Sequence, residues 1–259
     1  LFYISGLYDG TSIDALDFAV TEADPDNIMS FATFQQKVYF FGSKVLQIYY
    51  NSGNADFPIE SVSGAVFPVG LLAPRSLEVV DSRLCWLGCT KDGIGCVYSM
   101  SGTSISRIST FPIEQKISQY NKPELAYAYV YQDNGHYFYV LNFEDADTTW
   151  VYDATTGMWH ERQSYENGKM TKHRAKHHLY AYGEHIVGDY ANTKLYKMSD
   201  NYATDDGAPI VRVRISPHLT KEMTMIVHGY FQLDIVTGVG LDGSPSIGAD
   251  PQVELQYSN

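Results

Sequence analysis

The stretch Lys37-Val38-Tyr39-Phe40-Phe41-Gly42 predicts the fold, because runs of the same character recur along the chain at nearly equal intervals. β-Branched and aromatic residues suit the half-buried surface of a strand. The steps from Val38 to Leu84, then to Tyr137 and to Ile186, are 46, 53 and 49 residues. A period of roughly 40 to 50 residues is typical of β-propeller blades. The related runs are Arg83-Leu84-Cys85-Trp86-Leu87-Gly88, His136-Tyr137-Phe138-Tyr139-Val140 and His185-Ile186-Val187-Gly188.

A second strand signal follows each run, and a third precedes it. The following strand carries an aliphatic residue and then tyrosine, as in Ile48-Tyr49, Val97-Tyr98, Val151-Tyr152 and Leu195-Tyr196. The preceding strand candidates are 29–34, 76–80, 125–131 and 178–182. We therefore expect an all-β fold, a β-propeller-like repeat of antiparallel blades near residues 29–54, 76–110, 125–164 and 178–203. An all-β sandwich with strands at similar intervals is the alternative.

The pattern changes near residue 207, and this change predicts two regions. Residues 1–206 form the propeller region, and residues 207–259 form an additional C-terminal β element. In this second region, 211–215 and 253–257 alternate apolar and polar residues, and 223–236 predicts a long amphipathic strand or strand pair. Four blades supply fewer strands than a closed ring needs. Because the chain starts without Met and stops directly after a strand pattern, we expect a fragment of a longer protein.

The charge of the chain argues against tight binding to nucleic acid. The formal net charge is -12 and the pI is about 5.0, so phosphate backbones are repelled over much of the surface. The walls of a channel through which DNA slides benefit from such repulsion. We therefore expect any DNA to pass through without being tightly bound.

Cysteine usage and hydropathy predict a protein without disulfides, structural zinc or a membrane span. Cys85, Cys89 and Cys96 are odd in number and form no paired C-x-x-C spacing, so we interpret them as reduced core thiols. No stretch approaches the roughly 18 to 20 apolar residues that cross a bilayer. Synthesis in a cytoplasm is the expectation.

The order of short motifs along the chain resembles that of the packaged-DNA stabilisation proteins of short-tailed bacteriophages, also called tail accessory or tail hub proteins. The resemblance extends over most of the chain, and the order is more specific than any single motif. The motifs are Ser5-Gly6, Ala15-Leu16-Asp17-Phe18-Ala19, Ala23-Asp24-Pro25-Asp26, Phe41-Gly42, Tyr50-Asn51-Ser52-Gly53, Arg107-Ile108-Ser109-Thr110, Gly135-His136, Thr149-Trp150-Val151-Tyr152-Asp153, Trp159-His160-Glu161-Arg162, Gly188-Asp189 and Gly238-Val239-Gly240.

This resemblance implies a structural protein of the virion tail, assembled in the host bacterial cytoplasm. It implies a homo-oligomer, a hexameric ring that is added below the portal after packaging, closes the DNA exit and seats the distal tail parts. Its partners would be portal or portal-adaptor proteins, a tail needle or plug, and tailspike proteins. The resemblance carries over no catalytic residue and no cofactor.

One dense positive cluster stands out in this acidic chain, between residues 169 and 178. We interpret it as a loop that is either solvated or in contact with DNA or with an acidic neighbouring subunit. Metal binding by His173, His177 and His178 is not expected, because lysine and arginine surround them and strand residues four apart are about 13 Å apart. The candidate contact residues are Lys169, Lys172, His173, Arg174, Lys176 and His177.

Other polar motifs are better explained by structure than by catalysis. Residues 144–147 predict a charged hairpin tip, because the glycine and glutamate of a calcium-binding hand are missing. His160 and Glu161 are adjacent on a predicted strand and so point to opposite faces, while Trp159 is expected to pack within a blade. We therefore predict no enzyme. Two alternatives stay open, a propeller glycosidase with converging carboxylates and a kelch-like protein-binding module.

Overall fold

The computed structural model describes residues 1–6, 8–21, 26–54, 57–89, 93, 95–202, 204–216, 226–227, 229–234 and 253–256. The motifs at Ala23-Asp24-Pro25 and Gly238-Val239-Gly240 lie outside these residues, as do residues 223–225, 228 and 235–236 of the predicted strand 223–236. The described part of that strand, residues 226–227 and 229–234, has no strand assignment. The chain divides into two compact units. The first unit comprises residues 1–163 and 172–197, and the second comprises residues 164–171 and 198–259.

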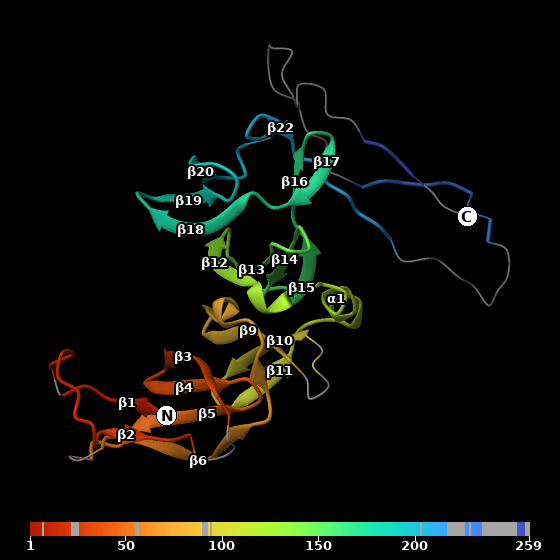
Figure 1. The fold of residues 1–259 in the computed structure, drawn as a ribbon. Helices are drawn as coiled ribbons and strands as arrows, with labels where there is room; N and C mark the ends of the chain where they lie inside the picture. Colours follow the sequence, from red (N-terminus) through yellow and green to blue (C-terminus); the bar gives the residue numbers. More distant parts are fainter. Residues whose placement is uncertain are drawn as a thin grey trace. The chain divides into compact units, whose positions relative to one another are not determined.

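The first unit contains a succession of antiparallel sheets, each built from strands that follow one another in sequence (Figure 1). The first sheet is β3 (Ile28–Phe34), β4 (Lys37–Gly42), β5 (Leu46–Asn51) and β6 (Ile59–Phe67). The second sheet is β7 (Gly70–Leu71), β8 (Glu78–Val80), β9 (Arg83–Cys89), β10 (Gly95–Ser101) and β11 (Ser104–Arg107). The third sheet is β12 (Tyr127–Asp133), β13 (His136–Phe143), β14 (Thr148–Asp153) and β15 (Met158–Glu161). The fourth sheet is β18 (Ala175–Ala181), β19 (Glu184–Asp189) and β20 (Leu195–Met198).

Shorter elements complete the two units. In the first unit these are the pair β1 (Phe2–Tyr3) and β2 (Phe18–Ala19), the 3-10 turns η1 (Pro74–Ser76) and η2 (Pro123–Leu125), and the helix α1 (Phe111–Ile117). The hairpins β16 (Gln163–Glu166) with β17 (Lys169–Lys172) and β21 (Thr204–Asp205) with β22 (Ala208–Pro209) lie mostly in the second unit. In the part of the chain that the structure describes, no helix is long and apolar enough to span a membrane.

The all-β prediction is confirmed, with differences at the sheet boundaries. The first sheet continues to Phe67, beyond the expected limit at residue 54, and the second begins at Gly70. Residues 211–215 and 253–256, predicted as strands, have no strand assignment. Alternation of apolar and polar residues indicates a tendency to form strands, but a strand also needs a neighbouring edge to satisfy its backbone groups.

The four repeated tyrosines occupy corresponding strands. Tyr49, Tyr98, Tyr152 and Tyr196 lie on β5, β10, β14 and β20, and each of these strands follows the strand that carries the recurring run. Among Tyr49, Tyr98 and Tyr152, the register differs in one case. Tyr98 pairs with Trp86 and Tyr152 with Tyr139, the fourth residue of each run, whereas Tyr49 pairs with Val38, the second residue.

Consecutive sheets bury their faces against one another. One core cluster joins the first and second sheets, where the fully buried Trp86 lies 5.1 Å from Phe41 between ring centroids and 5.8 Å from Tyr98. A second cluster joins the second and third sheets and includes Ile113 and Ile117 of α1. Burial of aromatic and aliphatic surface is the main source of stability at these contacts.

A glycine permits the close contact between the first two sheets. A Cβ atom on Gly70 would lie 1.9 Å from the backbone oxygen of Ser43, in the turn between β4 and β5. Any side chain at position 70 would therefore push the two sheets apart.

Candidate functional site

The contact between the third and fourth sheets differs in chemistry from the two core clusters. Tyr127, Tyr129 and Tyr131 alternate along β12 with Ala128 and Val130. Because successive side chains of a strand point to opposite faces, the three tyrosines share one face, while Ala128 and Val130 pack on the core cluster shared with the second sheet. The tyrosine face meets β18, where His178 lies 6.1 Å from Tyr129 and 5.6 Å from Tyr131 between ring centroids.

The basic residues between 169 and 178, predicted as one loop that is either solvated or in contact with DNA or an acidic neighbouring subunit, lie mostly on two strands, β17 and β18. Lys169 begins β17 and belongs to the second unit, whereas Lys172 to His177 belong to the first unit and lead into β18. Lys169 and His177 are exposed, and Lys172 and Arg174 are buried. The loop interpretation was wrong because the residues that cover these cations come from distant parts of the sequence.

The buried cations are engaged by their own chain. The ammonium of Lys172 lies 4.2 Å from the ring centroid of Tyr190. Nη1 of Arg174 donates to Oδ2 of Asp189 at 3.1 Å and to the hydroxyl of Tyr196 at 3.3 Å. Since Asp189 ends β19 and Tyr196 lies on β20, Arg174 ties the three strands of the fourth sheet together.

The acidic hairpin tip between β13 and β14 anchors the same basic segment to the third sheet. Nζ of Lys176 donates to Oε1 of Glu144 at 2.7 Å, and the backbone N–H of Lys172 donates to Oδ1 of Asp147 at 3.1 Å. The prediction of a charged hairpin tip at residues 144–147 is confirmed. The tip contacts β18 through the ion pair with Lys176 and the end of β17 through the hydrogen bond from the backbone of Lys172.

His173 is partly buried in this contact, and its imidazole is uncharged at neutral pH. Its backbone N–H donates to Oγ1 of Thr149 at 3.1 Å, and Thr149 in turn donates to Oδ1 of Asn142 at 2.7 Å. Nε2 of His173 is buried without a hydrogen-bond partner. Burial, together with the guanidinium groups of Arg162 and Arg174, lowers the pKa of His173 to about 3. His173 therefore offers no positive charge to a phosphate group at neutral pH.

Cations also lie over the aromatic rings of the tyrosine face. The guanidinium of Arg162 lies 5.5 Å from the ring centroid of Tyr131, and that of Arg75 lies 5.5 Å from Tyr127. Lys176 approaches Tyr127 at 5.4 Å. Such contacts attract the cation to the face of the ring and restrict the movement of both side chains. The sequence reasoning missed these tyrosines, although the alternation Tyr127-Ala128-Tyr129-Val130-Tyr131 already indicates a one-sided aromatic strand.

The three histidines considered as metal ligands do not come together. His173 lies over Thr149, His177 is exposed, and His178 pairs with His185. Across the described residues, no group of three or more His, Cys, Asp or Glu side chains is arranged to hold a metal ion. Trp159 packs in its blade as predicted, 5.1 Å from Tyr152, and donates to the backbone oxygen of Ile108 at 2.8 Å.

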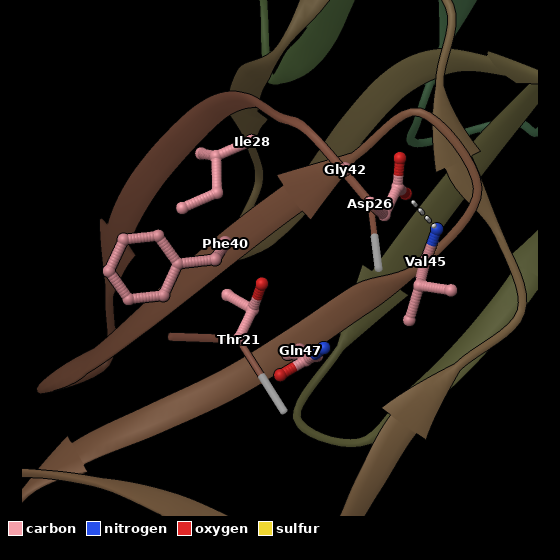
Figure 2. Close-up of a pocket in the computed structure, with 7 residues that line it drawn as sticks. All are labelled: Thr21, Asp26, Ile28, Phe40, Gly42, Val45 and Gln47. Carbon is pink, nitrogen blue, oxygen red and sulfur yellow. Dashed lines mark hydrogen bonds between the residues drawn. The ribbon is translucent and has the colours of Figure 1, made fainter. Parts of the chain in front are cut away.

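A small cavity in the first sheet is shaped by a turn and offers no room for a ligand. Figure 2 shows its lining, in which Asp26 points at the turn between β4 and β5. The carboxylate of Asp26 accepts from the backbone N–H groups of Lys44 and Val45 at 2.6 and 3.2 Å, and from the hydroxyl of Ser43 at 2.6 Å. Burial opposes the charge of Asp26, but these donors lower its pKa overall. The cavity volume of about 10 Å³ suits one water molecule at most.

Comparison with known sequence families identifies the family to which this architecture belongs. The sequence family described as "Bacteriophage P22 Gp10, beta-propeller" matches residues 1–203. No curated protein matches the chain. The family description agrees with the predicted propeller and with the predicted resemblance, and the match includes all four sheets of the first unit. Because it covers well over half of the 259 residues, the chain belongs to this family of phage structural proteins that stabilise packaged DNA.

Proposed function

We propose that this protein assembles in the phage tail below the portal after the genome has been packaged, closes the DNA exit and seats the distal tail parts. The family match over residues 1–203 carries the proposal, because it assigns the chain to phage structural proteins that stabilise packaged DNA. Packaged DNA is under pressure to leave, so a protein that stabilises it must either hold the DNA or block its path.

The charges of the chain favour blocking over holding. The net charge of -12 repels phosphate. Within the basic segment, Lys172 and Arg174 are buried and Lys176 is paired with Glu144. Lys169 and His177 are exposed and stay candidates for a contact with DNA or with a neighbouring subunit. Retention on this proposal is steric, and DNA passes through the open assembly without being tightly bound.

The proposed assembly is a hexameric ring that contacts portal or portal-adaptor proteins on one side and a needle or plug and tailspikes on the other. Ring formation needs surfaces that lose apolar area on assembly. The first unit offers such positions, with Phe31 on the first sheet and Leu179 and Leu195 on the fourth sheet exposed to 64%, 63% and 74%. These residues support the proposal as places where apolar surface is available.

The test uses particles assembled without this protein. Filled heads are counted before and after purification, and we expect the heads to fill normally and then to lose their DNA. Complementation with the wild-type protein, and separately with Lys169→Gln and His177→Gln together, should restore retention, since closure does not depend on gripping phosphate. Heads that stay full without the protein, with infectivity lost only at host attachment, would overturn the sealing role.

A further inference from the structure

The strand β3 forms one edge of the first sheet, because it pairs only with β4. A two-residue turn with positive φ at both residues joins the two strands, and Phe34 pairs with Lys37 beside it. Such a hairpin closes on a hydrogen-bonded pair, so alternate residues of β3 point their backbone groups away from β4. These residues are Phe31 and Thr33, and in the described part of the chain their backbone groups have no partner. They form an open edge, beside which the Phe31 side chain is 64% exposed.

This open edge lacks the features that protect other sheet edges. Charged residues, short length and bulges keep most exposed edges from pairing with another chain. Among the described edge strands of more than four residues, only β3 has no charged residue, since β6 contains Glu60, β12 contains Asp133 and β18 contains Lys176. The one register shift of β3 lies between Ile28 and Ser30, before the open edge begins. The edge is therefore suited to receive a further strand.

The second unit contains a segment with strand character and no partner, residues 211–215, which we call the donor segment. Its apolar residues alternate with arginines, so an extended backbone puts Val211, Val213 and Ile215 on one face and both guanidinium groups on the other. The three apolar side chains are 50%, 66% and 89% exposed. No backbone group of the donor segment bonds to another described residue. A strand of this kind needs the edge of a sheet to satisfy its backbone groups.

The charge of the donor segment favours a second copy of the chain as its partner. The segment carries two arginines, and residues 208–218 around it contain no acidic residue, whereas each copy has a net charge of -12. This opposite charge favours the encounter of the segment with another copy. Because the donor segment and the open edge are different surfaces, each copy can give one strand and receive one. A contact of this kind closes into a ring.

We propose that the donor segment of one copy pairs with the open edge of β3 in the next copy. The pairing rests on the homo-oligomer of the proposed function and identifies a contact that holds it together. The added strand supplies backbone hydrogen bonds to Phe31 and Thr33. Its apolar row continues the face of β3 that carries Ala32 and Phe34, which pack on the core cluster of the first two sheets. Its arginines then lie on the exposed face beside the ring of Phe31.

Two variants of the full chain each remove one half of this contact. Thr33→Pro removes an N–H that β4 does not use, and an edge strand tolerates proline at such a position. Val213→Asp combined with Ile215→Asp removes most of the apolar row of the donor segment. Each variant should weaken the self-association of the purified protein, measured by sedimentation velocity, by about tenfold or more. Val227→Asp, at a side chain 83% exposed in the same unit, is the matched control and should associate like the wild type.

A mixture of the two variants tests whether the strand passes between copies. Thr33→Pro keeps the donor segment, and the double aspartate variant keeps the open edge. The mixture should therefore form one-to-one pairs that neither variant forms alone. Hydrogen exchange at the Phe31 and Thr33 amides of the double aspartate variant should slow on mixing, because these amides gain hydrogen-bond partners.

Four results would overturn the strand pairing. Two are a wild type that stays monomeric and variants that associate as strongly as the wild type. A loss of association in Thr33→Pro alone would show that two β3 edges pair with each other. Slow exchange of the Phe31 amide in a monomer would show that the edge is covered within one chain. Each of these results leaves the sealing role standing, because that role is tested by the retention of DNA in heads.

Discussion

Two contacts between sheets differ in their side chains. One joins the first and second sheets, and the other joins the third and fourth sheets. The former buries Trp86 against Phe41 and Tyr98 in an apolar core. The latter sets His178, Arg162 and Lys176 against a face of tyrosines. An apolar core is insensitive to pH and salt, whereas ionic and imidazole contacts respond to both. The comparison predicts that the contact between the first and second sheets keeps its stability when pH or salt changes. The stability of the contact between the third and fourth sheets should depend on both.

The largest effect is expected from Trp86→Ala. The change removes a fully buried indole and leaves a cavity, which should lower the free energy of unfolding by about 3 to 5 kcal/mol. Urea unfolding at pH 7.5 and 5.5 should give the same loss. Tyr182→Ala, at a side chain 97% exposed, is the control and should change stability little. If the loss of unfolding free energy in Trp86→Ala depends strongly on pH, the contrast between the two contacts is contradicted.

A somewhat smaller effect is expected from Arg174→Leu. The substitution leaves the carboxylate of Asp189, whose side chain is fully buried, without its guanidinium partner, at a cost of about 3 kcal/mol. Arg174→Leu combined with Asp189→Asn should be less harmful than the sum of the two single changes. Urea unfolding of the four proteins gives the coupling between the residues. Strict additivity would show that the ion pair does not hold the fourth sheet together.

A structural element of this protein can be predicted from the sequence when the residues that determine it are neighbours in the sequence. The recurring run at Lys37 predicts its strands because hydrophobic alternation is a local property. β6 was missed because a register shift and Gly64, at a φ of +74°, interrupt its pattern. β7 has two residues and carries almost no signal.

The site was harder to predict than the strands. The buried ammonium of Lys172 contacts the ring of Tyr190, and the buried guanidinium of Arg174 pairs with Asp189. The residues next to these cations in the sequence do not identify either partner. His178 was considered only with His173 and His177, although its partner His185 lies across a hairpin. A run of basic residues in a sequence shows that cations are present. It does not identify the residues that bury them in the fold.

A moderate effect on pH dependence is expected from His173→Leu. Because burial lowers the pKa of His173 to about 3, its neutral form stabilises the fold above pH 6.5, and this contribution is lost as the pH falls toward 3. Between pH 6.5 and 4.5 the loss amounts to about 1.4 kcal/mol per pH unit. The variant should be as stable as the wild type at pH 7.5 and should lose stability less steeply on acidification. Parallel curves of unfolding free energy against pH would contradict the assignment.

The smallest effect is expected from Lys176→Met. Both side chains of the Lys176–Glu144 pair are partly exposed, so its removal should cost less than about 1 kcal/mol. The cost should shrink further at high salt, because screening weakens an exposed pair. Urea unfolding in low and high salt measures both. A large loss of unfolding free energy that does not change with salt would show that the Lys176–Glu144 pair behaves as a buried contact.

The central claim, that the protein retains the genome by closing its exit, is tested most directly by adding the protein back. Heads packaged without it are mixed with purified wild-type protein at once or after a delay, and the genome DNA that stays resistant to nuclease is measured. Prompt addition should preserve the resistant DNA, and delayed addition should preserve less, because DNA already released cannot be recovered. Heads that keep their DNA equally well with and without the protein would contradict the claim.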